Sequence, residues 1–241
     1  WGKGKKNKGT GLAFDGSNDY VDAGDIADAD GGTQKTIALW AKQTSLGINQ
    51  ILIAKWDYQT QGSWAIQTDN TDNTKFRAFI ADSLTSAGSS IIDSSTGVWT
   101  AGVWHHVVLV YDGSGTTAAA RGKLYLDGVQ LTTTNTAGTV PTSMQASTAT
   151  VKIGKFGGTL DRFWNGAIDD VRIYNRALTA NEIRAIYKGQ HIINGLVGYW
   201  PLFGNSNPEP DMSEKQNLGN VIGALKDTPH PGFRFPHGPI R

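Results

Sequence analysis

Short apolar segments separated by turn-forming residues recur along the chain. In the segment TIALWAKQ, residues Ile37, Leu39 and Ala41 occupy every second position, which is the periodicity of a half-buried β-strand. The segment WHHVVLVYDG is the most apolar one and also predicts a strand. Many short strands joined by glycine-rich turns favour an all-β sandwich or jelly roll.

The same pattern predicts further strands. Residues 63–69 and 75–83 form a predicted hairpin around a polar stretch, and residues 123–131 form a second one around the turn Asp127-Gly128. The remaining predicted strands of the sandwich lie at 11–14, around Tyr20-Val21, and at 50–56, 151–156 and 167–178. After about residue 190, a strand ended by Pro201 is predicted in GLVGYWPLFG, and another is predicted in NLGNVIGAL.

One short helix is predicted within residues 179–189. Thr179 and Glu182 have the T-x-x-E spacing of a capping box. An apolar stripe follows, made by Ile183, Ile186 and Tyr187, and Gly189 stands where a C-cap is expected. We expect this helix to pack on the edge of the sandwich.

Composition narrows the class of protein. The 241 residues include no cysteine, which excludes a disulfide framework, a thiolate metal site and a cysteine nucleophile. No run of about 18 apolar residues is present, so the sequence predicts no membrane-spanning segment. The chain has 18 Asp but three Glu, and this composition favours turns and strands over helices. Its first residue is Trp, which indicates processing or an incomplete start.

The formal net charge of +1 hides an asymmetry. Residues 1–10 carry four lysines and no acid, which leaves −3 for the rest of the chain; the lysines are Lys3, Lys5, Lys6 and Lys8. This basic N-terminal arm is either a solvated tail or an arm that binds an acidic neighbour in an assembly. Specific nucleic-acid binding is not favoured, because no further basic stripe follows.

Five segments, in this order, resemble those of the laminin-G-like (concanavalin A-like) jelly-roll domains: FDGSNDYVDAG, IALWAK, WHHVVLVYDG, LYLDGVQ and IDDVRIYNRALTANEIRAIY. The resemblance covers about residues 11–188 and is most specific in the last segment. It implies two antiparallel sheets of about six or seven strands each, packed face to face in residues 11–189. The basic arm 1–10 would precede this jelly roll, and a Pro-rich extension, 190–241, would follow it.

The position of one strand departs from that family. A strand like GLVGYWPL usually comes before the FDGSNDYV segment, but here it follows the helix. The extension either folds back and supplies the missing edge strand to its own sandwich, as in a circular permutation, or supplies it to a neighbouring copy. We favour the first alternative. A separate second domain is not expected, because about 50 residues with seven prolines bury little core.

No catalytic constellation is predicted, although the jelly-roll superfamily includes glycan hydrolases. Those enzymes need two carboxylates that act together, and no alternating E-x-D-x-E pattern occurs. The glutamates all lie outside the predicted strands of the sandwich: Glu182, Glu209 and Glu214. Asp169 and Asp170 are adjacent and should point to opposite faces. His105 and His106, one inward and one outward, are expected to serve packing. The chain is therefore predicted not to be an enzyme.

The resemblance implies a calcium ion on the rim of the sandwich, with Asp15, Asn18, Asp19 and Asp170 as candidate ligands. Alternatively, the turn residues bond their own backbone, and Asp170 pairs with Arg172. For a glycan ligand, aromatic rings on rim loops could stack on sugar faces. The candidates for this role are Trp56, Tyr58, Trp64, Phe163 and Trp164.

Two functions fit these features. The favoured one is a non-catalytic structural or surface component of an assembly, such as a phage virion (capsid) decoration or fibre protein, in which both arms bind protein neighbours in a homo-oligomer or virion. The alternative is a free-standing carbohydrate-binding or adhesion module, extracellular or at a cell surface, that binds glycans with or without calcium.

Overall fold

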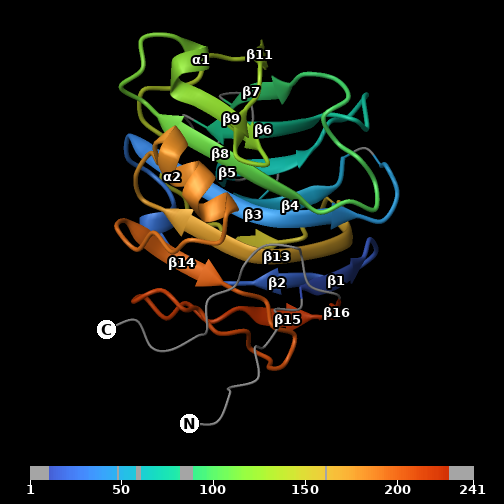
Figure 1. Ribbon diagram of the computed structural model, residues 1–241. Helices are drawn as coiled ribbons and strands as arrows, with labels where there is room; N and C mark the ends of the chain where they lie inside the picture. The colour runs from blue at the N-terminus through green and yellow to red at the C-terminus, as the bar shows by residue number, and fades with distance from the viewer. Residues whose placement is uncertain (1–10, 48, 58–60, 82–88, 161, 228–241) are drawn as a thin grey trace.

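The structure is a computed structural model, and it describes residues 11–47, 49–57, 61–81, 89–160 and 162–227. In this part of the chain, two antiparallel β-sheets pack face to face (Figure 1). The all-β jelly-roll sandwich expected from the sequence is therefore confirmed. Each sheet has eight strands, slightly more than expected.

The first sheet has the strand order β10-β9-β8-β3-β13-β1-β16, and β14 also pairs with β13. Its strands are β1 (Leu12–Asp15), β3 (Gln34–Gln43), β8 (His105–Asp112), β9 (Gly122–Leu126), β10 (Val129–Gln130), β13 (Asn165–Tyr174), β14 (Leu196–Trp200) and β16 (Leu225–Lys226). The predicted hairpin at residues 123–131 is confirmed by the pairing of β9 with β10.

The second sheet has the order β11-β7-β6-β5-β4-β12-β2-β15. Its strands are β2 (Tyr20–Asp22), β4 (Ile51–Asp57), β5 (Gln61–Thr68), β6 (Phe76–Ala81), β7 (Ser89–Ser94), β11 (Thr133–Ala137), β12 (Val151–Ile153) and β15 (Asn220–Ile222). The other predicted hairpin is confirmed as β5 and β6. A 3₁₀ turn (Ala27–Ala29) and two helices, α1 (Ala118–Arg121) and α2 (Ala180–Tyr187), complete the described part.

Apolar side chains of both sheets meet in one core. Along β3, the alternating residues Ile37, Leu39 and Ala41 face this core and are fully buried, as their spacing predicts. The largest fully buried side chains are three tryptophans: Trp64 of β5, Trp164 just before β13 and Trp200 of β14. Removing a ring of this size from a core costs about 3–5 kcal/mol, so these residues serve the fold.

Helix α2 covers the outer face of the first sheet, not its edge (Figure 1). The capping box is confirmed, because the Thr179 hydroxyl accepts the Glu182 N–H and the Glu182 carboxylate accepts the Thr179 N–H. Ile183 and Ile186 are buried against the outer side chains of β3, β8, β9 and β13. The expected edge position was wrong because those strands are apolar on both faces and need a cover.

The strand predicted after the helix pairs within its own chain. β14 lies antiparallel to β13, with Trp200 opposite Val171. Further along, β15 pairs with β2 in the second sheet, and β16 pairs with β1 in the first. Figure 1 shows these red strands beside the blue N-terminal ones. The described part of the C-terminal extension therefore adds strands to both sheets of its own sandwich.

Four described elements were not predicted: β7, β11, α1 and the 3₁₀ turn Ala27–Ala29. The single strand predicted in NLGNVIGAL is divided between β15 and β16. Strands β7 and β11 have the sequences SSIIDS and TTNTA, which offer few apolar positions for a period-two pattern. Helix α1 is a single turn of four residues and buries none of them. Within the described residues, no helix has the length and apolar character needed to cross a bilayer.

Candidate functional site

Three of the predicted metal ligands lie in one turn, between β1 and β2. Asp15 Oδ1 accepts the backbone N–H groups of Ser17 at 2.7 Å and Asn18 at 3.3 Å. Asp19 Oδ2 accepts the N–H of Asp15 at 2.9 Å. The turn thus makes the local side-chain-to-backbone bonds that stabilise such a conformation without metal.

Asp19 is the most buried carboxylate of this turn. It is 7% exposed, and burial raises the pKa of the Asp19 carboxyl above its ordinary value. Gly223, between β15 and β16, lies directly against Asp19: a Cβ there would collide with Asp19 Oδ1, and the backbone φ is +75°. A glycine is therefore needed for this turn to close over the carboxylate.

Asp170 lies away from that turn. Asp15 stands opposite Asn165 on β13, and Asp170 is five residues further along the strand, a separation of about 17 Å at ~3.3 Å per residue. Asp170 is 6% exposed and holds Arg172 by two hydrogen bonds of 3.1 Å. The structure thus separates it from Asp15, Asn18 and Asp19 and gives it the arginine partner foreseen as the alternative.

A cluster of metal-binding side chains is not found in the described part of the chain, where no three His, Asp or Glu groups gather closely enough to hold an ion. Calcium binding therefore stays a prediction. Asp15, Asn18 and Asp19 remain its candidates, because they share one turn.

Three of the predicted sugar-stacking aromatics are core residues. Trp64 and Trp164 are fully buried, and their indole N–H groups donate to the carbonyl oxygens of Ala29 and Ala167. Trp56 is 4% exposed and packs edge-on against Phe79 and Phe156. The stacking role proposed for Trp56, Trp64 and Trp164 is therefore wrong in this structure, because their ring faces are covered.

Phe163 is the predicted aromatic that stays partly open. It is half-buried in the connection between β12 and β13. The ammonium of Lys155 lies 5.1 Å from the Phe163 ring centroid and 4.9 Å from that of Tyr20. Tyr20 neighbours Asp19, so this aromatic patch of Tyr20, Lys155 and Phe163 adjoins the turn described above. Tyr58 and the arm residues Lys3, Lys5, Lys6 and Lys8 lie outside the described residues.

A hollow lies at the β15–β16 turn, along edge strand β16 of the first sheet. It has a volume of about 380 Å³ and is open to solvent. Its walls are the loop Gly204, Asn205, Ser206 and Asn207 and the strand-turn residues Val221 and Gly223 to Lys226, with Leu12 also lining it. The three loop side chains at 205–207 are exposed. We call this hollow the edge pocket.

The loop of the edge pocket is held from beneath by Glu209. This side chain is fully buried, and its two oxygens accept the N–H groups of Phe203 at 2.9 Å and Gly204 at 2.7 Å. Burial raises the pKa of the Glu209 carboxyl, against these hydrogen bonds, which lower it. The Asn207 side chain forms two hydrogen bonds with the backbone of Val221: its NH₂ group donates to the Val221 carbonyl, and its oxygen accepts the Val221 N–H. The pocket is therefore preformed.

Sequence reasoning missed this pocket. The segment FGNSNPEP reads as a turn-rich link, and its Asn and Ser residues carry no periodicity. One signal for a binding pocket was available: the small polar residues Asn205, Ser206 and Asn207 follow closely after the predicted strand that ends at Pro201. Because its partner wall, residues 221–226, could be placed only once the extension had folded back, the sequence alone could not assemble the pocket.

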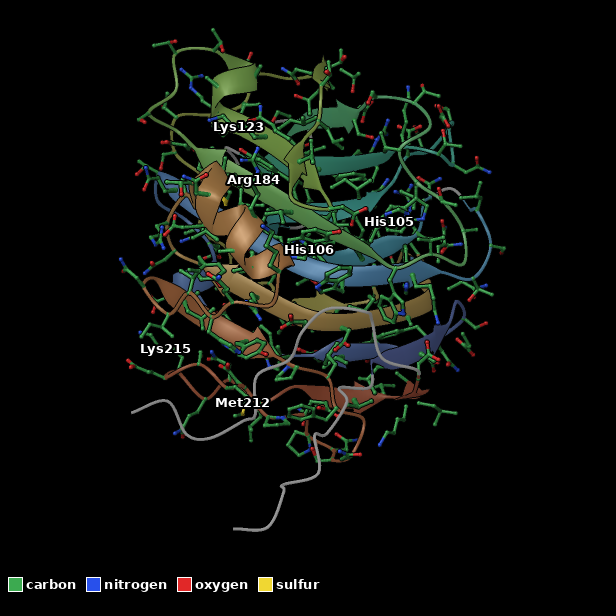
Figure 2. All side chains as sticks on the ribbon, in the orientation of Figure 1. His105, His106, Lys123, Arg184, Met212 and Lys215 are labelled. Carbon is green, nitrogen blue, oxygen red and sulfur yellow. The ribbon has the colours of Figure 1, made fainter. Side chains whose placement is uncertain are left out.

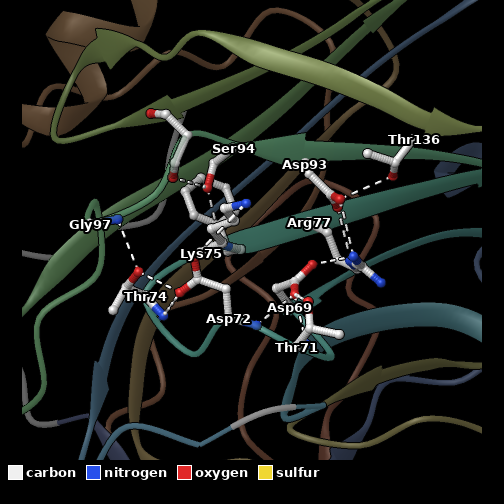
Figure 3. A network of polar contacts seen from close by, with 12 residues as sticks. Asp69, Thr71, Asp72, Thr74, Lys75, Arg77, Asp93, Ser94, Gly97 and Thr136 are labelled. Carbon is white, nitrogen blue, oxygen red and sulfur yellow. Dashed lines mark hydrogen bonds and ion pairs between the residues drawn. The ribbon is translucent and has the colours of Figure 1, made fainter.

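A second polar cluster belongs to the fold (Figure 3). Arg77 of β6 is 8% exposed and is held by Asp93 and Asp69. Burial tends to raise the pKa of Asp69, but the N–H groups of Thr71 and Asp72 and the Arg77 charge lower it overall. Because the single Arg77 guanidinium binds carboxylates on either side of it, this cluster ties the β5–β6 hairpin to β7.

The adjacent histidines take structural positions on opposite faces of β8, as expected. His105 faces the core, where its ring lies 5.1 Å from that of Trp99, and its Nδ1 is 2.9 Å from Asp127 Oδ2. His106 lies on the outer face near the end of α2, 5.9 Å from the Tyr187 ring (Figure 2). Glu182, Glu209 and Glu214 all lie outside the strands of the two sheets.

Two antiparallel sheets packed face to face around one apolar core define the chain as a jelly-roll sandwich. The family model described as the concanavalin A-like lectin/glucanases superfamily matches residues 15–184. This chain belongs to that superfamily. We found no curated protein similar to it in sequence.

Solved structures with this fold share little sequence with the chain. A Bacteroides ovatus protein provisionally assigned as carbohydrate binding is 16% identical with a TM-score of 0.70, over 92% of this chain and 60% of that protein. This chain thus spans less than two thirds of that protein. A heptameric SAP-like pentraxin from Limulus polyphemus is 16% identical, with a TM-score of 0.60 over 93% and 97% of the two chains.

A third similar structure is the CBM40 of a Ruminococcus gnavus sialidase bound to α2,3-sialyllactose. It is 17% identical, with a TM-score of 0.53 over 73% of this chain and 96% of that one. At these identities, the likeness concerns the fold.

Proposed function

We propose that this protein is a carbohydrate-binding module and that it binds its glycan at the edge pocket. The lining of the pocket carries the proposal: Asn205 and Ser206 present exposed polar side chains beside the exposed, apolar Leu225. Amide and hydroxyl groups exchange hydrogen bonds with sugar hydroxyls, and aliphatic side chains contact the C–H face of a sugar ring.

Two further observations support a glycan ligand. The descriptions of two similar structures name carbohydrate binding or a bound sialyllactose. The aromatic patch of Tyr20, Lys155 and Phe163 offers half-buried rings as a further surface for a longer glycan. An extracellular or surface location suits such a module.

The proposed module acts without catalysis. Its carboxylates have other partners: Asp170 holds Arg172, and Glu182 holds Arg176 and the helix N-terminus. Glu209 is fully buried beneath the pocket loop. None of these three is both exposed in the pocket and paired with a second carboxylate, as glycoside hydrolysis requires.

A glycan array tests the proposal. The wild-type chain should bind at least one glycan class, and the double variant Asn205→Ala/Ser206→Ala should lose that binding. Asn70→Ala, at an exposed asparagine in the β5–β6 connection, is the matched control and should bind like the wild type. An array on which the wild type binds nothing would overturn the function, and binding by the double variant at full strength would overturn the site.

The structural role in an assembly is a second hypothesis that stays a prediction. The structure and the comparisons provide no support for a virion, capsid or fibre. The heptameric pentraxin shares the fold and nothing more specific. The mass of the purified chain in solution, measured by light scattering, would separate a monomeric module from a homo-oligomer.

A further inference from the structure

The edge pocket carries a positive charge. Lys226 of β16 is the charged residue of its lining, which contains no Asp or Glu. The other polar side chains of the lining are neutral: Asn205, Ser206 and Asn207. A ligand in this pocket therefore meets an ammonium group without meeting a carboxylate.

The charge of Lys226 is not neutralised by a carboxylate in the described part of the chain. Its Nζ lies 2.8 Å from Asn205 Oδ1, an uncharged amide oxygen. The next residue along the chain, Asp227, forms an ion pair with Lys42 at 3.0 Å. Glu209 is fully buried behind the loop, where its oxygens accept backbone N–H groups. An anion entering the pocket would thus be the first carboxylate or sulfate partner of this lysine.

The hydrogen-bonding groups that remain available in the pocket are mainly donors. The Asn205 amide oxygen accepts a hydrogen bond from the Lys226 ammonium, so the NH₂ group of Asn205 is left for a ligand. Asn207 uses both ends of its amide on Val221, so it serves as scaffold. Ser206 adds an exposed hydroxyl. A carboxylate or a sulfate accepts several hydrogen bonds at once and gains strength from the cation beside them.

Close packing keeps Asn205 and Lys226 together. Gly204 has φ +63°, and a Cβ at this position would lie 2.9 Å from the Lys226 Cβ. A glycine therefore lets the loop approach β16 closely enough for the Asn205–Lys226 contact. Beside this pair, Leu225 is 73% exposed and lines the same pocket, so an apolar contact lies next to the charged one.

We propose that the edge pocket selects acidic glycans by binding their anionic group, a carboxylate or a sulfate, between the Lys226 ammonium and the Asn205 amide. This inference rests on the proposed carbohydrate-binding function and adds the charge of the ligand to it. Leu225 then contacts the ring that carries the anionic group.

Titration calorimetry with matched sugar pairs tests this selection. The probes are methyl glucuronide against methyl glucoside, and galactose 6-sulfate against galactose, each titrated into the full chain. We expect each bound acidic sugar to bind at least tenfold more tightly than its neutral counterpart, and less tightly as salt is added. The pair with the larger difference identifies carboxylate or sulfate as the preferred group.

Three variants separate charge from shape. Lys226→Gln should weaken binding of the acidic sugar about tenfold or more, since a hydrogen bond to a charged group is lost, whereas Lys226→Arg should largely restore it. Asn205→Asp places a carboxylate beside Lys226 and should also weaken acidic-sugar binding at least tenfold. Lys188→Gln, at an exposed lysine after α2, is the control and should bind like the wild type.

The outcomes distinguish this inference from the function on which it rests. Equal affinity for acidic and neutral sugars, or equal losses for both in Lys226→Gln, would overturn the selection of acidic glycans and leave the carbohydrate-binding function standing. Failure to bind any probe, together with a silent glycan array, would overturn both. Circular dichroism of each variant confirms that a loss of binding is not a loss of folding.

Discussion

The backbone N–H of Asp227 donates a hydrogen bond of 2.7 Å to the carbonyl oxygen of Gly11. Strand β16 therefore ends where β1 begins, although the two are separated by nearly the whole described chain. In the family that this sequence resembles, the strand corresponding to β14 precedes β1. Strands β14, β15 and β16 thus pair with β13, β2 and β1 of the same chain, an arrangement that a circular permutation would preserve.

A circularly permuted chain should therefore fold. We would join Asp227 to Gly11 through a short Gly-Ser linker and open the chain between Ile193 and Asn194, which are both exposed. Since all strand pairings are kept, the free energy of unfolding should stay within about 2 kcal/mol of that of the unpermuted chain 11–227. Urea denaturation measured by tryptophan fluorescence provides the comparison.

The control is a chain that ends at Gly189. It lacks β14, β15 and β16, and with them Trp200, which is fully buried in the core. It should show no cooperative unfolding transition, because both sheets lose edge strands. A stable, cooperative truncated chain would mean that the extension contributes nothing to its own sandwich, and a permuted chain that folds only as a dimer would favour exchange between copies.

The fold was predictable where local pattern and tertiary environment agree. Ile37, Leu39 and Ala41 alternate in the sequence and face one core in the structure. Thr179 and Glu182 have capping-box spacing and form that box. Strands such as β11 were missed because an edge strand needs little apolar sequence: it is stabilised by pairing with β7, which a single sequence does not display.

The candidate site was less predictable because exposure depends on the whole fold. Trp164 and Phe163 are adjacent in sequence, yet one is fully buried and the other half-buried. Asp15 and Asp170 could meet only if β1 and β13 paired in another register, and the observed pairing sets Asp15 opposite Asn165. The edge pocket joins residues 204–207 to residues 221–226 through a folded-back strand, a contact with no signature in either segment.

Substitution of the adjacent residues Trp164 and Phe163 directly tests the difference in their burial. Trp164→Ala should lower the free energy of unfolding by about 3–5 kcal/mol, because it removes a fully buried ring and its hydrogen bond to Ala167. Phe163→Ala should cost about 1 kcal/mol, since a half-buried ring loses less apolar contact. Chemical denaturation of both variants checks the order, and equal losses would contradict the assigned burial.

The Arg176–Glu182 pair should make stability pH-dependent in acid. The Glu182 carboxylate accepts hydrogen bonds from the Arg176 side chain and from the capping N–H of Thr179. These bonds lower the pKa of Glu182 from 4.5 to about 2. A depressed pKa adds stability that is present above pH 4.5 and is lost as the pH falls through 2. Glu182→Gln should therefore cost about 1–2 kcal/mol at pH 7, and the difference from wild type should vanish near pH 2.

Unfolding free energies at pH 7, 4 and 2.5 measure this effect. Glu214→Gln, at an exposed glutamate outside α2, is the control and should follow the wild type at each pH. A Glu182→Gln deficit that stays constant down to pH 2.5 would assign the loss to altered packing and not to the charge.

The predicted calcium binding should depend on Asp19 and not on Asp170. Asp19 is 7% exposed and shares its turn with Asp15 and Asn18, whereas Asp170 lies about five strand residues away and is paired with Arg172. Calorimetric titration of chelator-treated protein should give calcium heat in the wild type and none in Asp19→Asn. Asp170→Asn should lower stability, because it weakens a buried ion pair, yet keep the calcium heat. No heat in the wild type would reject the calcium prediction, and loss of heat in the Asp170 variant while it remains folded would reject the separation of the two sites.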